Sequence, residues 1–318
     1  MLRVFLSLLA VRQCVADVTW RAIGCENWSF QGKTMDQMWD NSVAMTTQAQ
    51  SQIDAIPTRP SFKYTEAQKI AAANAEFMFG VKFTNHVGLN SAGQATMSTA
   101  RAMYDDVRGG LEGTLAGLDV NNAFLFCGSN GLVKKSIPDY IGGPSPIWHA
   151  EIVDESEGDD KKPTEHITLS YITPSSPEPC TEGAEQSYAG KTFTATQVIG
   201  DTRTDFVGII LCPNVWENDG LKVFATLDEG YGAEKEAPNQ YPYIGHYNSI
   251  SGTLLHEMVH VVGRVRENKK WEDPGVGFKL ATKLAKDSQT TALINPDTYR
   301  IFAEMSMSPA TRWGMPNA

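Results

Sequence analysis

The sequence predicts an α+β fold, with helices toward both ends of the chain and β-strands in the middle. Apolar residues recur every three or four positions before about residue 118 and again after residue 250, which is typical of helices. Between these parts, short runs rich in β-branched and aromatic residues are typical of strands. The chain has 318 residues, 42% of them hydrophobic, and is long enough to bury a sizeable core.

The positions of the helices and strands follow from these patterns. Helices with core-facing apolar stripes are expected at residues 35–53, Glu66–Phe79 and 97–111. Strands are expected at residues 123–127, Ile147–Val153, 166–172 and 207–212. Three more helices are expected at residues 254–262, 278–288 and 297–305, and Asn295 and Pro296 fit the start of the last one.

The domain organisation is expected to be simple, because the chain contains neither an internal repeat nor a low-complexity linker. We expect a single domain over residues 17–318. Its helical part covers about 17–118 and its sheet and active-site part about 119–318, with the helices packed on a twisted mixed sheet. Nothing in the sequence requires more than a monomer.

The charge balance argues against two classes of partner. The formal net charge is -10, from 27 basic and 37 acidic residues. Nucleic-acid binding and binding to an anionic membrane surface both favour basic surfaces, so we expect neither. Protein or peptide partners remain compatible with this charge.

The first 16 residues have the pattern of a signal peptide. Arg3 supplies a positive charge, residues 4–11 are mostly apolar, and small residues follow at Cys14–Ala16. A secreted, extracellular protein is therefore expected. Removal of residues 1–16 leaves four of the five cysteines, which allow two disulfides in three alternative pairings. These cysteines are Cys25, Cys127, Cys180 and Cys212.

The motif H-E-x-x-H at residues 256–260 indicates a zinc site. His256 and His260 are four residues apart, so on a helix both imidazoles reach one ion from the same face. Glu257 is then placed to take a proton from an attacking water, whose pKa zinc lowers toward about 7. The apolar residues around the motif favour a buried helix whose histidines face a cleft. The alternative is a buried helix with two ordinary core histidines.

A catalytic zinc site needs a third protein ligand and one open position. The sequence alone leaves several candidates open. They are Glu267, Glu272, Asp273 and Glu304 after the motif, and His246 before it.

Three segments carry a family resemblance. They are His256–Gly263 (HEMVHVVG), Asp273–Gly277 (DPGVG) and Asn295–Met305 (NPDTYRIFAEM). Together they resemble the deuterolysin or aspzincin family of fungal zinc metalloendopeptidases, which includes lysine-specific enzymes. The resemblance implies a zincin-like fold, one Zn²⁺ per chain and Asp273 as the third ligand. It also likens Cys25 and Cys127 to the first cysteine pair of that family.

The chain departs from the family pattern after the motif. Lys270 and Trp271 replace a Gly-Thr pair, and Val276 stands where the family has a tyrosine thought to stabilise the oxyanion. Tyr241, Tyr243 and Tyr247 are candidates to replace that donor. Two functions are therefore expected. The first is a secreted zinc endopeptidase, and the alternative is a catalytically impaired zinc-binding homologue that acts by binding a protein.

Two further residue roles have alternative interpretations. Asp297 either complements the dipole of the last helix or, as the resemblance implies, binds a lysine side chain after the scissile bond. The strand at residues 207–212 is either central in the sheet or an edge that pairs with an extended substrate.

Overall fold

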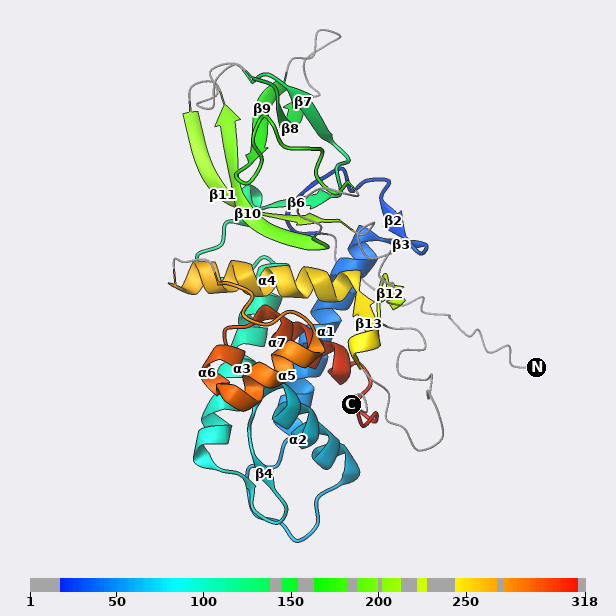
Figure 1. Ribbon diagram of the computed structural model, residues 1–318, viewed down its shortest axis with the longest axis vertical. Helices are drawn as coiled ribbons and strands as arrows, with labels where there is room; N and C mark the ends of the chain where they lie inside the picture. Colours follow the sequence, from blue (N-terminus) through cyan, green and yellow to red (C-terminus); the bar gives the residue numbers. More distant parts are fainter. Residues whose placement is uncertain are drawn as a thin grey trace, which may run out of the picture.

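The fold has a curved β-sheet on one side and a helical layer on the other, with one long helix between them (Figure 1). The computed structural model describes residues 18–137, 145–153, 163–181, 188–199, 202–212, 222–227, 244–267 and 271–313. The expected signal peptide, residues 1–16, lies outside these residues. The expected α+β class and mixed sheet are confirmed.

The helices lie close to where the apolar stripes place them. They are α1 (Met35–Ala55), α2 (Glu66–Phe79), α3 (Ser91–Leu111), α4 (Ile250–Glu267), α5 (Phe278–Asp287), α6 (Gln289–Ala292) and α7 (Pro296–Ser306), with 3-10 turns η1 (Val120–Asn122) and η3 (Ile244–His246). Thr34 and Thr65 begin α1 and α2 with capping boxes, each completed by a glutamine three residues later. Gly80 ends α2 in the left-handed conformation that glycine favours.

The main sheet has seven strands in the order β1-β6-β11-β10-β9-β8-β7. Its strands are β1 (Arg21–Ile23), β6 (Phe124–Cys127), β7 (Leu132–Lys135), β8 (Ile147–Val153), β9 (Pro163–Leu169), β10 (Gly190–Ile199) and β11 (Thr202–Leu211). The pairs β1–β6 and β6–β11 are parallel, and the other pairs are antiparallel.

Three short two-stranded sheets complete the described strands. They are β2 (Ser29–Phe30) with β3 (Lys33–Thr34), β4 (Phe83–Thr84) with β5 (Gly88–Leu89), and β12 (Lys222–Phe224) with β13 (Tyr247–Ser249).

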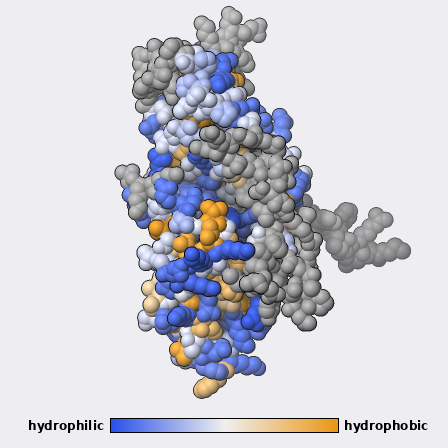
Figure 2. Space-filling model, viewed as in Figure 1, coloured by the Kyte–Doolittle hydropathy of each residue, from blue (hydrophilic) through white to orange (hydrophobic). Residues whose placement is uncertain are grey.

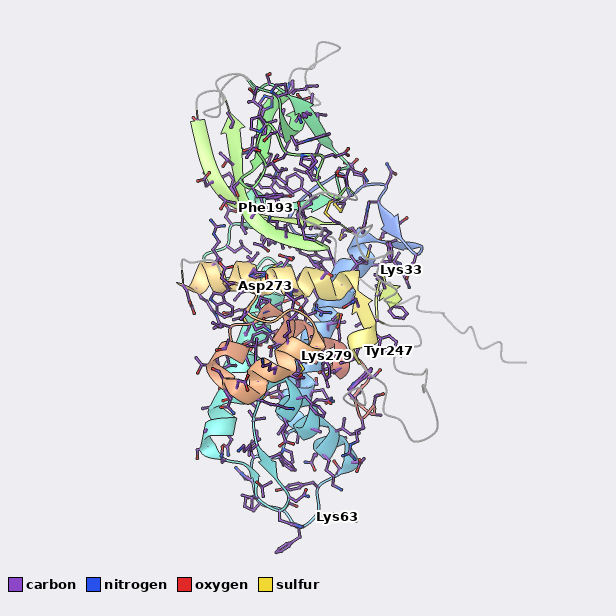
Figure 3. All side chains as sticks on the ribbon, viewed as in Figure 1. Lys33, Lys63, Phe193, Tyr247, Asp273 and Lys279 are labelled. Carbon is purple, nitrogen blue, oxygen red and sulfur yellow. A yellow bond between two sulfur atoms is a disulfide. The ribbon has the colours of Figure 1, made fainter. Side chains whose placement is uncertain are left out.

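Two hydrophobic cores lie on opposite faces of the sheet. On β6, Leu125 and Cys127 pack in the core shared with the helices, whereas Phe124 and Phe126 pack in the second core. This alternation is the period of two expected for a strand buried on both faces. Phe193 of β10 belongs to the second core (Figure 3).

The helical layer combines both ends of the chain. Helix α4 contacts β10 and β11 on one side and α1, α3 and α7 on the other. In Figure 1 it runs beneath the sheet, between the sheet and the other helices. The parts of the chain before and after residue 118 therefore share both layers. Helices α4 to α7 pack with the N-terminal helices, and β1 joins the sheet.

The strand expected at residues 207–212, which the sequence offers as either a central strand or a substrate edge, forms part of β11. Strand β11 pairs with β6 on one side and β10 on the other, so its central position is the correct alternative. Strand β10, which the sequence analysis missed, pairs with β11 along its whole length but with β9 only from Ala195 to Val198. Among the described residues, Gly190, Thr192 and Phe193 therefore have no ladder partner on the side of β9.

Two disulfides join the four expected cysteines. Cys25 binds Cys127 and so ties the segment after β1 to the end of β6. Cys180 binds Cys212 and ties the segment after β9 to the end of β11. None of the described helices has the length and apolar character needed to cross a membrane.

Candidate metal centre

The H-E-x-x-H motif lies in the middle of α4, where apolar side chains bury the helix on several sides. Leu254, Leu255, Met258 and Val259 are completely buried. His256 and His260 project from one face, one turn apart, with their ring centroids 5.0 Å apart. The helix thus brings the two imidazoles together, as the spacing predicts.

Three ligand atoms converge at this face. His256 Nε2 lies 3.2 Å from His260 Nε2, and Asp273 Oδ1 lies 3.1 Å from the first and 3.2 Å from the second. A tetrahedral ion with bonds of about 2.0–2.1 Å needs its ligand atoms about 3.3–3.4 Å apart. The observed triangle is close to that size, so the donor set fits a metal ion such as zinc.

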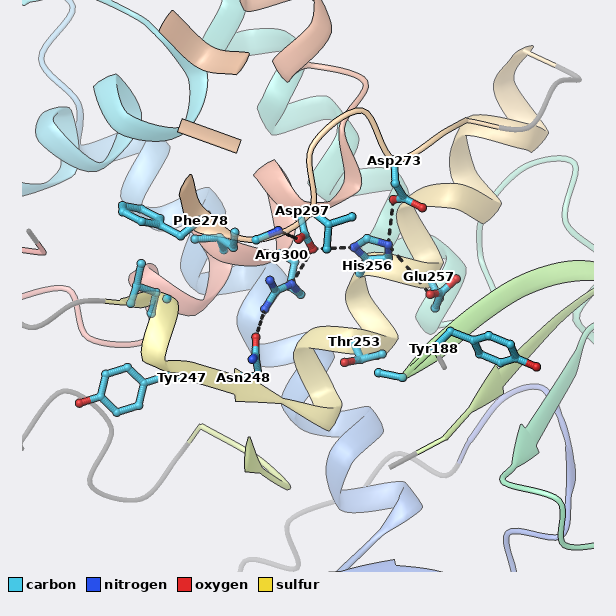
Figure 4. A pocket seen from close by; sticks show the side chains of 17 residues that line it. Tyr188, Tyr247, Asn248, Thr253, His256, Glu257, Asp273, Phe278, Asp297 and Arg300 are labelled. Carbon is cyan, nitrogen blue, oxygen red and sulfur yellow. Dashed lines mark hydrogen bonds and ion pairs between the residues drawn. The ribbon is translucent and has the colours of Figure 1, made fainter. Parts of the chain in front are cut away.

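Asp273 reaches the histidines from the loop between α4 and α5 (Figures 3 and 4). Its side chain is 39% exposed, so the cluster opens toward solvent. Trp271 helps to fix the loop by packing on Gly263, where an added β-carbon would lie only 2.4 Å from the indole. The tryptophan that departs from the family pattern therefore has a packing role here.

Asp273 is the third member that the structure brings together with His256 and His260. Glu304 is buried elsewhere, against Arg300 and Ser249. Neither Glu267 nor Glu272 belongs to a metal-compatible group of the described residues. Nothing is described of the His246 side chain.

Glu257 lies beside this cluster, with Oε1 4.0 Å from His256 Nε2. The hydroxyl of Thr192 on β10 is 2.8 Å from Glu257 Oε2 and 3.0 Å from its backbone oxygen, and both are acceptors. Gly190 permits the close approach of β10, because a β-carbon there would lie 2.9 Å from Glu257 Cγ and 2.6 Å from Thr253 Cγ2. The strand thus orients the carboxylate.

Asp297, in the first turn of α7, supports the cluster from behind. Its Oδ1 accepts from His256 Nδ1 and from Arg300 Nε, both at 2.8 Å, and its Oδ2 accepts from the backbone N–H of Gly277. A proton held on Nδ1 leaves the Nε2 lone pair of His256 directed at the metal position. Asn295 adds to this support by binding the backbone of Gly275.

This arrangement does not fit the expected substrate-binding role of Asp297. Its side chain is 3% exposed, and both of its oxygens are occupied by partners from the protein. A substrate lysine would have to displace them. The geometry instead favours a positioning role toward His256.

The electrostatics of the cluster favour a bound cation. Burial works to lower the pKa of His256, but the carboxylates of Asp297, Asp273 and Glu257 outweigh it and raise the pKa to about 10. Burial works to raise the pKa of Asp273, yet His256 and His260 hold it well below its usual range. In the same way, Arg300 and His256 lower the pKa of Asp297 despite its burial.

A network behind Asp297 continues the support into the core. Arg300 binds Asp297 and Asn248 (Figure 4). It also binds Glu304, with its Nη1 3.0 Å from Glu304 Oε2. The Arg300 guanidinium thus donates hydrogen bonds to two buried carboxyl groups, those of Asp297 and Glu304. Burial raises the pKa of Glu304 to about 7, although Arg300 works against this.

A pocket of about 520 Å³ opens in front of the cluster, a size suited to a peptide side chain or small ligand. The rings of Tyr188 and Tyr247 line it but point away from His256 in Figure 4. Tyr241 and Tyr243 lie outside the described residues. Val276 forms part of the rim and is 61% exposed. Figure 2 shows apolar side chains near the level of α4 and α5 on an otherwise largely hydrophilic face.

The chain matches no protein-family model, and no curated protein matches it in sequence. The functional assignment therefore depends on the site. Sequence reasoning found His256, Glu257, His260 and Asp273 but missed Thr192 and Gly190. Only the alternation of β-branched and polar residues in β10 could have indicated that strand, and nothing local linked it to the motif.

Proposed function

We propose that this protein is a secreted zinc-dependent metalloendopeptidase of the deuterolysin type, with a zincin-like fold. His256, His260 and Asp273 would hold one Zn²⁺ in this centre, and Glu257 would be the general base. The substrates would be proteins or peptides. The two disulfides support an oxidising, extracellular location.

The observation that carries the proposal is the joint geometry of three donors and a base. Two imidazole nitrogens and one carboxylate oxygen lie 3.1–3.2 Å apart, which suits one small ion. A separate carboxylate, Glu257, lies next to them in an open pocket without being part of the triangle. A structural metal site needs no such neighbour, whereas hydrolysis needs a base beside the metal.

A zinc ion in this centre would polarise the scissile carbonyl and lower the pKa of the attacking water. Glu257 would accept the proton from that water and deliver it to the leaving amine. Thr192 would hold the Glu257 carboxylate by binding Oε2, which leaves Oε1 free for the proton. Asp297 would keep His256 in the tautomer that presents Nε2.

The partly unpaired edge of β10 supports binding of an extended peptide. Among the described residues, Gly190, Thr192 and Phe193 have ladder partners on β11 but none on the side of β9. Tyr188, Ala189 and Gly190 also line the pocket. A substrate that adds a strand here would pass beside Glu257, and its backbone would supply the missing ladder bonds. The occupied carboxylate of Asp297 gives no support to a lysine preference.

The second candidate function is a zinc-binding homologue with little or no catalysis. The observation in its favour is the rim residue Val276, which has no donor for an oxyanion, together with the outward-pointing rings of Tyr188 and Tyr247. Loss of one oxyanion donor costs about 10²–10³ in turnover in other enzymes. Such a protein would bind a peptide in the same groove without cleaving it.

Digestion of a mixed peptide library, read by mass spectrometry, tests the proposal. Three samples are compared: zinc-loaded protein, chelator-treated protein, and chelator-treated protein to which zinc is restored. We expect cleavage of internal peptide bonds in the first and third samples only. Absence of cleavage by folded protein with zinc bound at this centre would favour the second candidate.

A further inference from the structure

A second group of two histidines and a carboxylate lies in the outer part of the sheet, far from α4 in Figure 1. His149 and Glu151 are two residues apart on β8, so their side chains leave the same face of the strand. His166 lies on the neighbouring strand β9, directly opposite Glu151. Sheet register therefore brings together three residues that the sequence keeps apart.

The histidines of this group offer free nitrogen atoms. His149 is completely buried, and its Nδ1 lies 2.9 Å from the backbone oxygen of Ile147. Donation to that oxygen places the proton on Nδ1 and leaves the Nε2 lone pair free. Among the described residues, neither His149 Nε2 nor His166 Nδ1 has a hydrogen-bond partner, although both atoms are buried. Unsatisfied buried nitrogens of this kind are costly unless something binds them.

The carboxylate completes the group. Glu151 Oε1 lies 3.6 Å from His149 Nε2, and its other oxygen accepts from Lys135 Nζ at 2.8 Å. The hydrogen bond to Lys135 orients the carboxylate so that Oε1 faces the imidazole. One ligand atom from each of the three residues lies within 4.8 Å of the others, so small side-chain rotations would close them around an ion.

We propose that His149, Glu151 and His166 form a second metal site, which takes a divalent transition ion such as Zn²⁺ and joins β8 to β9. Two imidazoles and one carboxylate are a donor set for Zn²⁺, Cu²⁺ or Ni²⁺ rather than for Ca²⁺ or Mg²⁺. The site lacks a neighbouring base such as Glu257 among the described residues, so its role is to stabilise the outer sheet. This inference does not depend on the proposed peptidase function.

Zinc stoichiometry of four proteins tests the proposal. Each is loaded with ZnCl₂, freed of excess ion by gel filtration and measured by elemental mass spectrometry. We expect about two zinc ions in the wild type, one in Glu151→Gln, one in Asp273→Ala and none in the double variant. The matched control is Glu165→Gln, which removes a carboxylate that binds Arg21 and Gln197 instead, and it should retain two.

A thermal measurement covers the case in which a variant loses zinc through poor folding. Added ZnCl₂ should raise the Tm of Asp273→Ala by roughly 5 °C and leave the Tm of the double variant unchanged. The proposal is overturned if the wild type holds one ion that only Asp273→Ala removes, or if zinc raises the Tm of both proteins equally. Neither result bears on whether the His256 centre cleaves peptides.

Discussion

The two groups of two histidines and one carboxylate are built on different secondary structures, and this difference sets what each can do. In the α4 group, helical spacing supplies two ligands and a loop supplies the third, so the centre lies at the mouth of a pocket. In the β8–β9 group, strand register supplies all three, and His149 is completely buried. The first has Glu257 beside it, whereas the second has Lys135.

Under the proposed function, the donor set alone does not make a catalytic centre. Among the described residues, the α4 group has beside it a second carboxylate, Glu257, which is held by Thr192 of β10 and lines a pocket. The β8–β9 group has the same kinds of donor, with His149 completely buried and Glu151 paired with Lys135, which suits a structural ion.

The largest effect is expected from removing the base. Glu257→Gln keeps the shape and the acceptor for Thr192 but cannot take a proton, so kcat/KM for a cleaved peptide should fall by about 10³-fold or more. Zinc content should not change. The matched variant Glu151→Gln should leave kcat/KM within about twofold. Equal losses of kcat/KM in Glu257→Gln and Glu151→Gln would contradict the claim that only the α4 group takes part in cleavage.

The next effect concerns the stability of the network behind the α4 group. The pKa of Glu304 is raised from 4.5 to about 7, so the folded state holds this proton more tightly than the unfolded state. The stabilisation of the folded state by protonated Glu304 is fully present below pH 4.5 and is lost as the pH rises through 7. Relative to Glu304→Gln, the wild type should lose about 3 kcal/mol of unfolding free energy between pH 4.5 and pH 8.

Denaturant unfolding of both proteins at several pH values, with chelator present, measures this difference. The surface variant Glu112→Gln is the control, since its carboxylate is exposed and should show no such difference. A constant difference between wild type and Glu304→Gln across this pH range would contradict the buried-network account.

A smaller effect is expected from the group that positions His256. Asp297→Asn keeps an acceptor for His256 Nδ1 but loses the charge beside Arg300 and presents an N–H to the Gly277 N–H. Zinc affinity, measured by competition with a chelator, should fall about 10- to 100-fold. The exposed variant Asp287→Asn should match the wild type. Unchanged zinc affinity in Asp297→Asn would contradict the positioning role of Asp297.

The smallest effect is expected from the strand that orients Glu257. Thr192→Val removes the hydroxyl at nearly constant size, and kcat should fall about 10-fold without loss of zinc. Thr192→Ser should restore most of the rate. The exposed β11 residue Thr204, changed to Val, provides the control. If Thr192→Val and Thr204→Val behave alike, β10 has no part in orienting the base.

Parts of this site that share one local element could be predicted from the sequence. His256, Glu257 and His260 lie within five residues of one helix, where spacing alone fixes their geometry. Asp273 required the family resemblance, because the path of a loop does not follow from spacing. The helices were found for the same local reason, since amphipathic stripes and capping residues lie within each segment.

Features that depend on the pairing of distant strands could not be predicted. Thr192 and Gly190 lie more than sixty residues before Glu257 and reach it only because β10 packs on α4. The run that contains His149 was expected to be a strand, but its register with β9, which selects His166 as a neighbour, is set by the whole sheet. The sequence also singles out Asp297, but its burial and its contacts with His256, Arg300 and Gly277 are tertiary properties that the sequence does not show.

The most direct test of the central claim is anomalous diffraction at the zinc edge from crystals of zinc-loaded protein. The account predicts a peak about 2.0–2.1 Å from His256 Nε2, His260 Nε2 and Asp273 Oδ1, with Glu257 beside it and unligated. A second peak is predicted between β8 and β9. Absence of a peak at α4, or a peak at which Glu257 is itself a ligand, would contradict the claim that this centre pairs a metal with a separate base.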